Sequence, residues 1–459
     1  MKNYFLPIAL LLITFSSFSQ NNVSKIDSII ALEYTNKEPG ISFLVAKEGK
    51  AMYHKAFGKS NLELNTSLQP NSVFQIGSIT KQFTAVSILI LAEQGKLNLN
   101  DKIGNYIPAY TDVGKDITIH HLLNHTSGIK NKTLLSAQNF IAKKDISPTE
   151  LIAYFKNEPL EFKAGEQFKY SNAGYILLGK IIEIVAKKSY GEFIKEHIFD
   201  KVGMSSSSYG NKKQDIKTSV SGYKVERNQF IKVDDMNLSL AYSAGGILST
   251  TNDLLKWQNA LLSNTLLKAS TIKKAMSPTI LNNGKKIPYG YGFRFSRLGR
   301  SPVIAHTGST KGFTSLSIYL PKEKVYITAL SNCNCKNINN VAKAVASQFV
   351  IIPKKNKKKT SERKSIKVAL KRLKEYVGSY EVRPNVSLKI GIDTTNQLYL
   401  LAPGQTKRIP LFAAKENHFF VKELKVEVTF NLEGNQTVSL TMHQSGRNIT
   451  AKKNNYETK

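Results

Sequence analysis

Apolar residues recur at helical spacing in two segments of the first 350 residues. The recurring positions are Ile79, Phe83, Val86 and Ile90 in the first segment, and Tyr175, Leu178, Ile182 and Val185 in the second. Intervals of three or four residues bring such side chains onto one helical face. The pattern therefore predicts a helix over 78–94, which Gly95 would end, and a second helix over 175–185.

Three other segments have the composition of strands. Residues 40–56 form one of them, and the apolar runs 315–320 and 325–330 are joined by the four turn residues 321–324. Two strands with so short a connection predict a hairpin. Helices combined with an antiparallel sheet predict an α+β body, or a sandwiched α/β body, in which helices flank the sheet.

A basic segment separates this body from the C-terminal residues. Between Pro353 and Glu375, eleven Lys or Arg residues stand against two Glu residues, and the first part of this run is typical of a solvated linker. After it, short runs of alternating polarity are separated by turn residues, which predicts a small all-β barrel or sandwich. We therefore expect a main domain over 20–352, a linker over 353–365 and a β-domain over 366–459.

The N-terminus has the pattern of a secretory signal peptide. Lys2 precedes an apolar run over 5–15, and the small residues Ser17 and Ser19 offer a cleavage site. The run is shorter than the roughly 20 apolar residues that a membrane span needs, and no later stretch supplies one. The sequence predicts that residues 1–19 are removed and that the protein is exported to the periplasm or the extracellular space.

The composition adds a strong positive charge. The 459 residues include 65 Lys or Arg against 33 Asp or Glu, a formal net charge of +32, and their 41% hydrophobic content excludes a disordered chain. Export, and a basic sequence without a nucleic-acid-binding motif, argue against DNA or RNA as a partner. A solvated, lysine-rich surface explains the charge most simply, and contact with an anionic cell-envelope polymer is the alternative.

Cys333 and Cys335 are the only cysteines, so no disulfide framework holds the exported chain together. We expect two free or partly buried thiols, because a bridge between residues two apart on one strand would be strained. Two cysteines cannot supply the four ligands of a structural zinc site. No cofactor and no metal are predicted.

The candidate chemistry begins with Ser78-Ile79-Thr80-Lys81, at the start of the first predicted helix. Positions i and i+3 share a helical face, so the Lys81 amine can reach the Ser78 hydroxyl. A serine becomes a useful nucleophile when a base accepts its proton and donors hold the developing oxyanion. To act as that base, Lys81 must be neutral, which a desolvated pocket or a neighbouring cation would favour.

Two further motifs carry polar groups that such a site needs. Tyr170-Ser171-Asn172 precedes the second helix and offers a phenol that relays a proton and an amide that binds a substrate amide or the lysine. His306-Thr307-Gly308-Ser309 follows an apolar strand, and Gly308 would let a substrate backbone approach closely. Ser-x-x-Lys alone is a weak signal because short patterns recur by chance, so the three motifs count together.

In this order, the motifs resemble those of the serine β-lactamase and penicillin-binding-protein superfamily, in its class C and related esterase and D-peptidase branch. Supporting matches lie at 119–128, at Gly165-Glu166 and at 243–250. The resemblance covers roughly residues 25 to 350 and implies a β-lactamase-like fold, with an antiparallel sheet flanked by helices and an all-helical subdomain. Tyr376-Val377-Gly378 and later motifs resemble a lipocalin-like β-barrel, for which we expect a packing or substrate-restricting role.

The resemblance also implies a role for each motif residue. Ser78 would be the acylated nucleophile, Lys81 its activating partner, and Tyr170 the general base for acylation and deacylation. Whether Lys81 or Tyr170 takes the first proton stays open. The backbone N–H groups of Ser78 and Ser309 would form the oxyanion hole. The residues expected to bind substrate are Asn172, His306, Thr307 and Gly308.

His306 departs from the lactamase pattern, in which a lysine is usual at this place. Histidine is mostly neutral at pH 7, since its unperturbed pKa is about 6.5, so capture of a substrate carboxylate should weaken. The sequence thus predicts an exported serine hydrolase that cleaves an ester or amide of D-amino-acid type in a small-molecule or peptide substrate. The alternatives are a β-lactamase or D-Ala-D-Ala carboxypeptidase, and a non-catalytic protein that binds envelope polymers.

His120, His121 and His125 raise the alternative of a metal site. His121 and His125 stand four residues apart, as in a helical zinc pair. No His-Glu-x-x-His motif and no acidic third ligand accompany them. We therefore expect these histidines to make capping and core hydrogen bonds.

Overall fold

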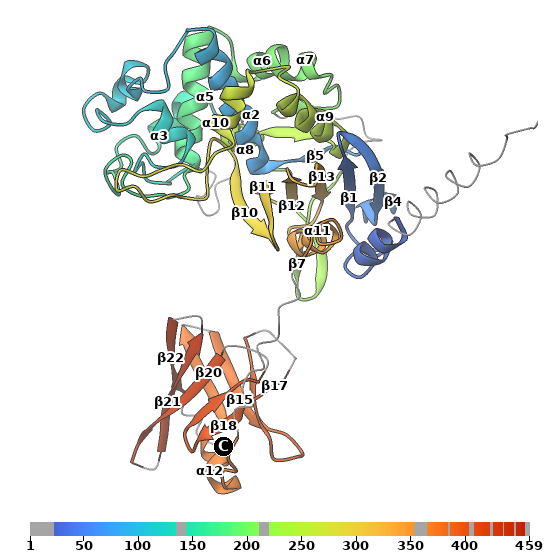
Figure 1. Cartoon of the computed structure of the whole chain (residues 1–459), viewed down its shortest axis with the longest axis vertical. Coiled ribbons are helices and arrows are strands. Elements are labelled where there is room, and N and C mark those ends of the chain that lie inside the picture. The colour runs from blue at the N-terminus through green and yellow to red at the C-terminus, as the bar shows by residue number, and fades with distance from the viewer. Residues whose placement is uncertain are drawn as a thin grey trace, which may run out of the picture. The chain divides into compact units, whose positions relative to one another are not determined.

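The chain forms two compact units in the computed structural model, Met1–Pro353 and Lys354–Lys459 (Figure 1). The structure describes residues 23–134, 144–210, 220–352, 365–383, 386–403, 408–422, 426–434, 436–444 and 447–454. The expected signal peptide, residues 1–19, and positions 353–364 of the expected linker lie outside the described residues. Within the described ranges, no helix is long and apolar enough to cross a membrane.

An antiparallel sheet of six strands forms the framework of the first unit. Its strands are β1 (Ile41–Lys47), β2 (Lys50–Phe57), β10 (Arg294–Leu298), β11 (Ser301–Thr310), β12 (Phe313–Leu320) and β13 (Val325–Ser331). Their order is β10-β11-β12-β13-β1-β2, so that β1 pairs with β13, with Ile41 opposite Ser331. The predicted hairpin of β12 and β13 and the predicted strand segment 40–56 are confirmed.

The two faces of the sheet are covered by different helices. Along β1, Phe43 and Val45 belong to the apolar cluster that includes α11 (Ile338–Ala346), whereas Leu44 and Ala46 pack with Leu255 of α9 (Thr251–Leu262). Alternate side chains of a strand point to opposite faces, so a strand buried on both sides reads as a continuous apolar run. This explains why β1 is buried from Ile41 to Ala46.

Helix α2 (Thr80–Glu93) lies at the centre of the helical part of the unit. Every residue from Thr80 to Leu91 is buried, so other elements surround this helix on all sides. Helices α5 (Asn172–Ala186) and α8 (Tyr242–Gly245) pack against it. Both predicted helices are confirmed, and the second begins three residues before its expected start. The further α-helices of this unit include α3 (Ile119–Leu123), α4 (Pro148–Ala153), α6 (Tyr190–Ile194), α7 (Asp200–Val202) and α10 (Ala269–Ala275).

The backbone of strand β11 contacts the backbone of the segment before α2. A Cβ atom on Gly308 would lie 2.0 Å from the carbonyl oxygen of Ile76 and 2.3 Å from the hydroxyl of Ser315. Ser315 itself donates a hydrogen bond of 2.7 Å to the Ile76 carbonyl. The close approach that we expected from a substrate backbone is therefore made here by the protein's own chain, which fixes Ile76 and the residues after it against the sheet.

Short strands hold the same segment from the other side. Strand β5 (Phe74–Gln75) pairs with β9 (Ile247–Ser249), and the Ile76 N–H donates to the Ile247 carbonyl at 3.1 Å. The small sheets of this unit also contain β3 (Lys59–Asn61), β4 (Thr66–Ser67), β6 (Ser208–Tyr209), β7 (Tyr223–Glu226) and β8 (Gln229–Lys232).

Cys333 and Cys335 form a disulfide, so the expectation of two free thiols is wrong. The two residues follow the end of β13, where the chain turns toward α11, and they are not on one extended strand. Their Cα atoms lie 5.1 Å apart, within the usual range for a bridge. Cys333 is buried, whereas Cys335 is exposed.

The second unit is a nearly closed barrel of nine strands. Its strand order is β17-β16-β15-β14-β22-β21-β20-β19-β18, and Leu411 alone separates the two edge strands in sequence. Tyr376, Phe419 and Phe430 are among the buried side chains that fill its interior. The barrel is preceded by α12 (Leu370–Tyr376). The strands are β14 (Gly378–Arg383), β15 (Val386–Ile392), β16 (Leu398–Leu401), β17 (Ile409–Pro410), β18 (Phe412–Lys415), β19 (His418–Phe420), β20 (Val426–Glu433), β21 (Gln436–Gln444) and β22 (Arg447–Lys453).

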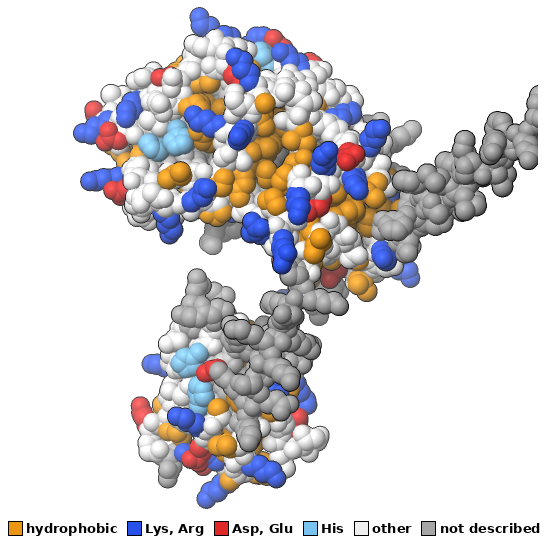
Figure 2. Space-filling view, in the orientation of Figure 1, with side chains coloured by type: hydrophobic (Ala, Val, Ile, Leu, Met, Phe, Trp, Pro, Cys, Tyr) orange, Lys and Arg blue, Asp and Glu red, His pale blue; other side chains and the backbone are white. Residues whose placement is uncertain are grey.

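Positive charge is distributed over the visible surface. On the face drawn in Figure 2, Lys and Arg side chains are spread over each unit, with fewer Asp and Glu side chains among them. They are interspersed with apolar and uncharged side chains over this face.

A substitution at Gly308 tests the backbone contact between β11 and Ile76. Gly308→Ala should lower the free energy of unfolding by about 1–3 kcal/mol, because the added methyl group overpacks a closed space. Gly174→Ala is the matched control, since a Cβ there meets only ordinary contacts of 3.7 Å or more on helix α5. Denaturant unfolding measures both, and equal stabilities for the two variants would contradict the contact.

Candidate active site

The Lys81 amine and the Ser78 hydroxyl meet at the start of α2. Ser78 lies in the single 3₁₀ turn η1 (Gly77–Ile79), and Lys81 lies in the first turn of α2 directly after it. The Lys81 nitrogen donates to Asn172 Oδ1 at 2.8 Å and to the Ala244 carbonyl at 2.8 Å, and it lies 3.1 Å from Ser78 Oγ. Three elements, α2, α5 and α8, thus converge on one amine.

The surroundings of Lys81 favour its neutral form. The side chain is fully buried, and all three of these neighbouring groups are uncharged. Burial lowers the pKa of Lys81 well below its usual value, and the positive charge of Arg294 lowers it further. A desolvated amine beside a second cation is the arrangement that lets a lysine accept a proton near neutral pH.

The Tyr170 phenol and the Asn172 amide come from the entry to α5. Ser171 is the N-cap of that helix, and its hydroxyl accepts the Gly174 N–H. The backbone N–H of Asn172 donates to Asn131 Oδ1 at 2.7 Å, which holds the backbone of the residue whose side chain contacts Lys81. The Lys81 nitrogen lies 4.9 Å from the centre of the Tyr170 ring.

Tyr170 is a neutral phenol at pH 7. Burial raises its pKa to about 12, although a hydrogen bond with Ser78 and the charge of Arg294 act in the opposite direction. A phenol with such a pKa gives up its proton only when another group takes it in the same step. The buried phenol therefore keeps its proton at neutral pH unless a neighbouring group accepts it.

His306 lies behind the site and not on its surface. Its side chain is fully buried, its Nε2 is 3.0 Å from the Tyr289 hydroxyl, and its Nδ1 is 2.8 Å from the Thr307 carbonyl. Burial and the neighbouring cations lower its pKa to about 3, so the imidazole is neutral. The expected direct contact of His306 with substrate does not fit this conformation, in which the neighbouring Thr307 and Ser309 are exposed.

The backbone of Ser309 lies against the turn η1, which carries Ser78. Gly77 has a φ of +48°, and a Cβ there would lie 2.8 Å from the Ser309 nitrogen. A side chain in this place would push β11 away from η1, so glycine is required by both its conformation and its size. The N–H groups of Ser78 and Ser309 thereby come from adjacent pieces of backbone, as the expected oxyanion hole requires.

Arg294 supplies a cation that the sequence analysis missed. It is exposed at the start of β10, and its guanidinium lies 5.1 Å from the centre of the Tyr170 ring and 5.5 Å from that of Tyr289. Arg294 stands opposite Ala305, next to His306, in the pairing of β10 with β11. Residues 294–298 alternate in polarity before the turn at Gly299, and this alternation could have predicted a strand that carries Arg294.

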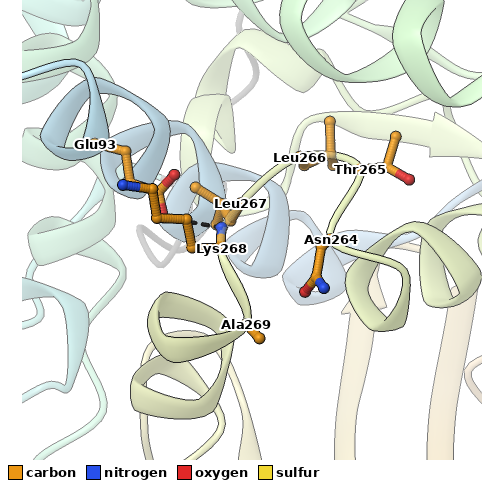
Figure 3. Close-up of a pocket in the computed structure, with 7 residues that line it drawn as sticks. All are labelled: Glu93, Asn264, Thr265, Leu266, Leu267, Lys268 and Ala269. Carbon is orange, nitrogen blue, oxygen red and sulfur yellow. Dashed lines mark hydrogen bonds between the residues drawn. The ribbon is translucent and has the colours of Figure 1, made fainter.

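The site is open to solvent at its reacting groups. Ser78, Tyr170 and Asn172 are half-buried, so each of these residues keeps part of its surface in contact with solvent. A hollow of about 380 Å³ lies elsewhere, at the far end of α2, where Glu93 accepts the Lys268 N–H at 3.0 Å (Figure 3). A helix of 14 residues is about 20 Å long at about 1.5 Å per residue, so this hollow is not part of the site.

The three candidate metal ligands have other partners. His121 Nδ1 accepts the Thr118 N–H at 3.1 Å, and His120 Nδ1 lies 2.6 Å from the Tyr291 hydroxyl. His125 Nδ1 accepts the Ser171 N–H at 3.2 Å. In the part of the chain that the structure describes, no group of three His, Cys, Asp or Glu side chains is arranged to hold a metal ion.

The chain belongs to the Beta-lactamase family, which matches residues 26–346, and it is a serine hydrolase of the penicillin-binding-protein-like type. A second family, described as Domain of unknown function (DUF3471), matches residues 362–456. Penicillin-binding protein 4* of Bacillus subtilis is 30% identical over 427 residues, which cover 88% of this chain and 92% of that protein. Protein flp of Staphylococcus aureus is 28% identical over 341 residues, 72% of this chain and 67% of that protein.

Solved structures resemble the fold over different lengths. The octameric penicillin-binding protein homologue from Pyrococcus abyssi is 26% identical with a TM-score of 0.62, over 96% of this chain and 100% of that one. The D-amino acid amidase from Ochrobactrum anthropi is 22% identical with a TM-score of 0.62, over 72% of this chain and 98% of that one. At this lower identity the likeness shows the fold alone.

Replacing Asn172 by aspartate, which has the same shape and a negative charge, tests whether uncharged partners keep Lys81 neutral. Asn172→Asp places a carboxylate at the 2.8 Å contact, which should raise the pKa of Lys81 by about 1–3 units. The acid limb of the pH profile of kcat/KM for a chromogenic ester should move to higher pH by that amount. At pH values below this limb, kcat/KM should fall about tenfold for each unit of pH.

Asn131→Asp provides the control, because the same change then lies one hydrogen bond further from the amine. It should shift the limb much less. An acid limb that stays in place in Asn172→Asp would show that Lys81 is not the group that titrates.

Proposed function

We propose that the protein is an exported acyl-transferring serine hydrolase that opens an ester or amide of D-amino-acid type through an acyl-enzyme on Ser78. The observation that carries the proposal is the buried Lys81 amine, whose nitrogen lies 3.1 Å from Ser78 Oγ and whose pKa is well below its usual value. The two N–H groups of the neutral amine donate to Asn172 Oδ1 and the Ala244 carbonyl, so the lone pair is left to take the Ser78 proton on attack.

In the first step, Lys81 Nζ accepts the Ser78 proton while Ser78 Oγ bonds to the substrate carbonyl carbon. The carbonyl oxygen becomes an oxyanion, which the N–H groups of Ser78 and Ser309 stabilise. Each such donor is typically worth about 3–4 kcal/mol in the transition state. The resulting ammonium lies over the Tyr170 ring, with its nitrogen 4.9 Å from the ring centre.

In the second step, the leaving alcohol or amine takes a proton from the Tyr170 hydroxyl, and Lys81 returns the proton to the phenolate. The carbon–leaving-group bond breaks and the acyl group stays on Ser78. Water then attacks the acyl carbon and gives one proton through Tyr170 to Lys81. The bond from the acyl carbon to Ser78 Oγ breaks, Ser78 Oγ takes the proton back from Lys81, and the carboxylic acid leaves. Both groups end each half-reaction in their starting states, as a catalyst must.

The names of two structural neighbours support the amide class. One neighbour is the D-amino acid amidase from Ochrobactrum anthropi, and another is a D-stereospecific amidohydrolase from Streptomyces. The neutral His306 and the open, half-buried nucleophile are compatible with such compact substrates.

A second candidate, D-Ala-D-Ala carboxypeptidase or β-lactamase, is favoured by Arg294. The substrates of both activities carry a carboxylate, and an exposed guanidinium beside Tyr170 can bind one through two hydrogen bonds. Weak carboxylate capture was expected because His306 stands where a lysine is usual. His306 is buried, and Arg294 can supply the cation in its place.

Export and the division into domains remain part of the proposal. The N-terminal pattern of residues 1–19 supports export, and the net charge of +32 would attract the protein to an anionic envelope. We propose domains over 20–352 and 366–459, with a linker over 353–365. The interior of the C-terminal barrel is filled by its own side chains, which favours packing over ligand binding for that unit.

Covalent labelling tests the nucleophile directly. A fluorophosphonate should label Ser78 in the wild type, and Ser78→Ala should lose the label and at least about a thousandfold of ester turnover. Ser263→Ala, on an exposed serine after α9, should keep both. A folded wild type that takes no label and turns over neither esters nor D-amino-acid amides would instead favour a non-catalytic envelope-binding protein.

Substrate comparison tests Arg294. Arg294→Gln should lower kcat/KM by about 10- to 100-fold for a substrate with a free carboxylate, because a charge-assisted contact is worth about 1.5–3 kcal/mol. A neutral p-nitrophenyl ester should lose less, since it feels only the change in the pKa of Lys81. Arg297→Gln, exposed on the same strand, is the control. Equal losses for both substrates would exclude carboxylate binding by Arg294.

A further inference from the structure

His125 occupies an unusual place beside the site. It lies just after α3, has a φ of +61° and is almost completely buried. A positive φ is uncommon in residues other than glycine, and is best tolerated by Asn, Asp and His. The hydrolase mechanism proposed above uses no atom of His125, so its conformation and burial require another explanation.

His125 accepts hydrogen bonds from the residues on both sides of Tyr170. The backbone carbonyl of His125 accepts the N–H of Lys169 at 3.0 Å, and its Nδ1 accepts the N–H of Ser171 at 3.2 Å. One residue thereby holds the backbone on both sides of the phenol. The imidazole also packs on the Tyr170 ring, with 4.3 Å between the ring centres.

The same ring contacts other aromatic side chains behind the phenol. Its centre lies 4.7 Å from that of Tyr289 and 5.0 Å from that of Tyr175. Tyr175 donates a hydrogen bond to the Leu123 carbonyl at 2.8 Å, which fixes this neighbour as well. The imidazole is therefore enclosed, and it cannot move without displacing Tyr170.

We propose that His125 is a positioning residue, whose carbonyl and Nδ1 fix the backbone around Tyr170 so that the phenol stays aligned with Lys81 and Ser78. This inference rests on the proposed function, because it assigns Tyr170 a proton to transfer. Proton transfer depends on alignment, and a shift of about 1 Å can cost about 100-fold in rate.

The protonation state of the ring suits this role. An Nδ1 that accepts an N–H must carry a lone pair, so the hydrogen of the neutral ring is on Nε2. Burial and the charges of Lys81, His306 and Arg294 keep the pKa of His125 well below its usual value. Nε2 is buried and has no hydrogen-bond partner among the described residues, a cost that simple packing would avoid.

The test compares two variants that both tolerate the positive φ. His125→Asn places an amide oxygen near the position of Nδ1, whereas His125→Gly offers no side-chain acceptor. We expect His125→Gly to lower kcat for a chromogenic ester about 100-fold with KM changed less than about threefold, because binding groups stay in place. We expect His125→Asn to recover kcat to within about tenfold of the wild type.

His121→Asn is the matched control. His121 accepts the N–H of Thr118, the N-cap of α3, and is not among the rings that contact Tyr170 in the described residues, so the change should leave kcat unchanged. Wild-type kcat in folded His125→Gly would overturn the proposal, and so would a folded His125→Asn whose kcat falls as far as that of His125→Gly. If His125→Gly does not fold, a loss of kcat of more than about tenfold in folded His125→Asn would overturn the proposal. Failure of the proposed function is distinguishable, because the wild type would then take no fluorophosphonate label.

Discussion

The arrangement depends on the burial of one amine among uncharged acceptors. Lys81 meets a hydroxyl, an amide oxygen and a backbone carbonyl, each within about a hydrogen-bond length, and Arg294 adds a second positive charge nearby. An ammonium in such surroundings lacks a compensating carboxylate, so the neutral amine is favoured. Every role that we propose for Ser78 and Tyr170 follows from this one protonation state.

The fold keeps the amine in place from several directions. Helix α2 is buried on all sides, and the backbone contact of Gly308 with Ile76 fixes the turn that carries Ser78. Asn131 anchors the Asn172 side of the site, and α8 supplies the Ala244 carbonyl. These contacts link residues far apart in sequence, which is why the motifs function together although no single one is specific.

The sequence predicts this site best where a residue type and a local spacing together define the chemistry. Ser78 and Lys81 are three residues apart on one turn, so their contact follows from helical geometry. Arg294 could not be predicted in the same way, because its place beside Tyr170 depends on the pairing of β10 with β11. His306 was expected to bind substrate, but the alternation of β11 buries it and exposes Thr307. The disulfide was missed because the chain turns after β13, where a continuous strand had been assumed.

The protonation state of Lys81 can be measured by titrating its side chain. Selective isotope labelling would allow the Cε and Nζ signals of Lys81 to be followed by NMR against pH in the folded protein, with Lys81→Arg used to assign them. The account predicts a pKa well below the ordinary lysine value of about 10.4. A pKa at or above that value would mean that the buried group is an ammonium at neutral pH and would contradict its role as the base.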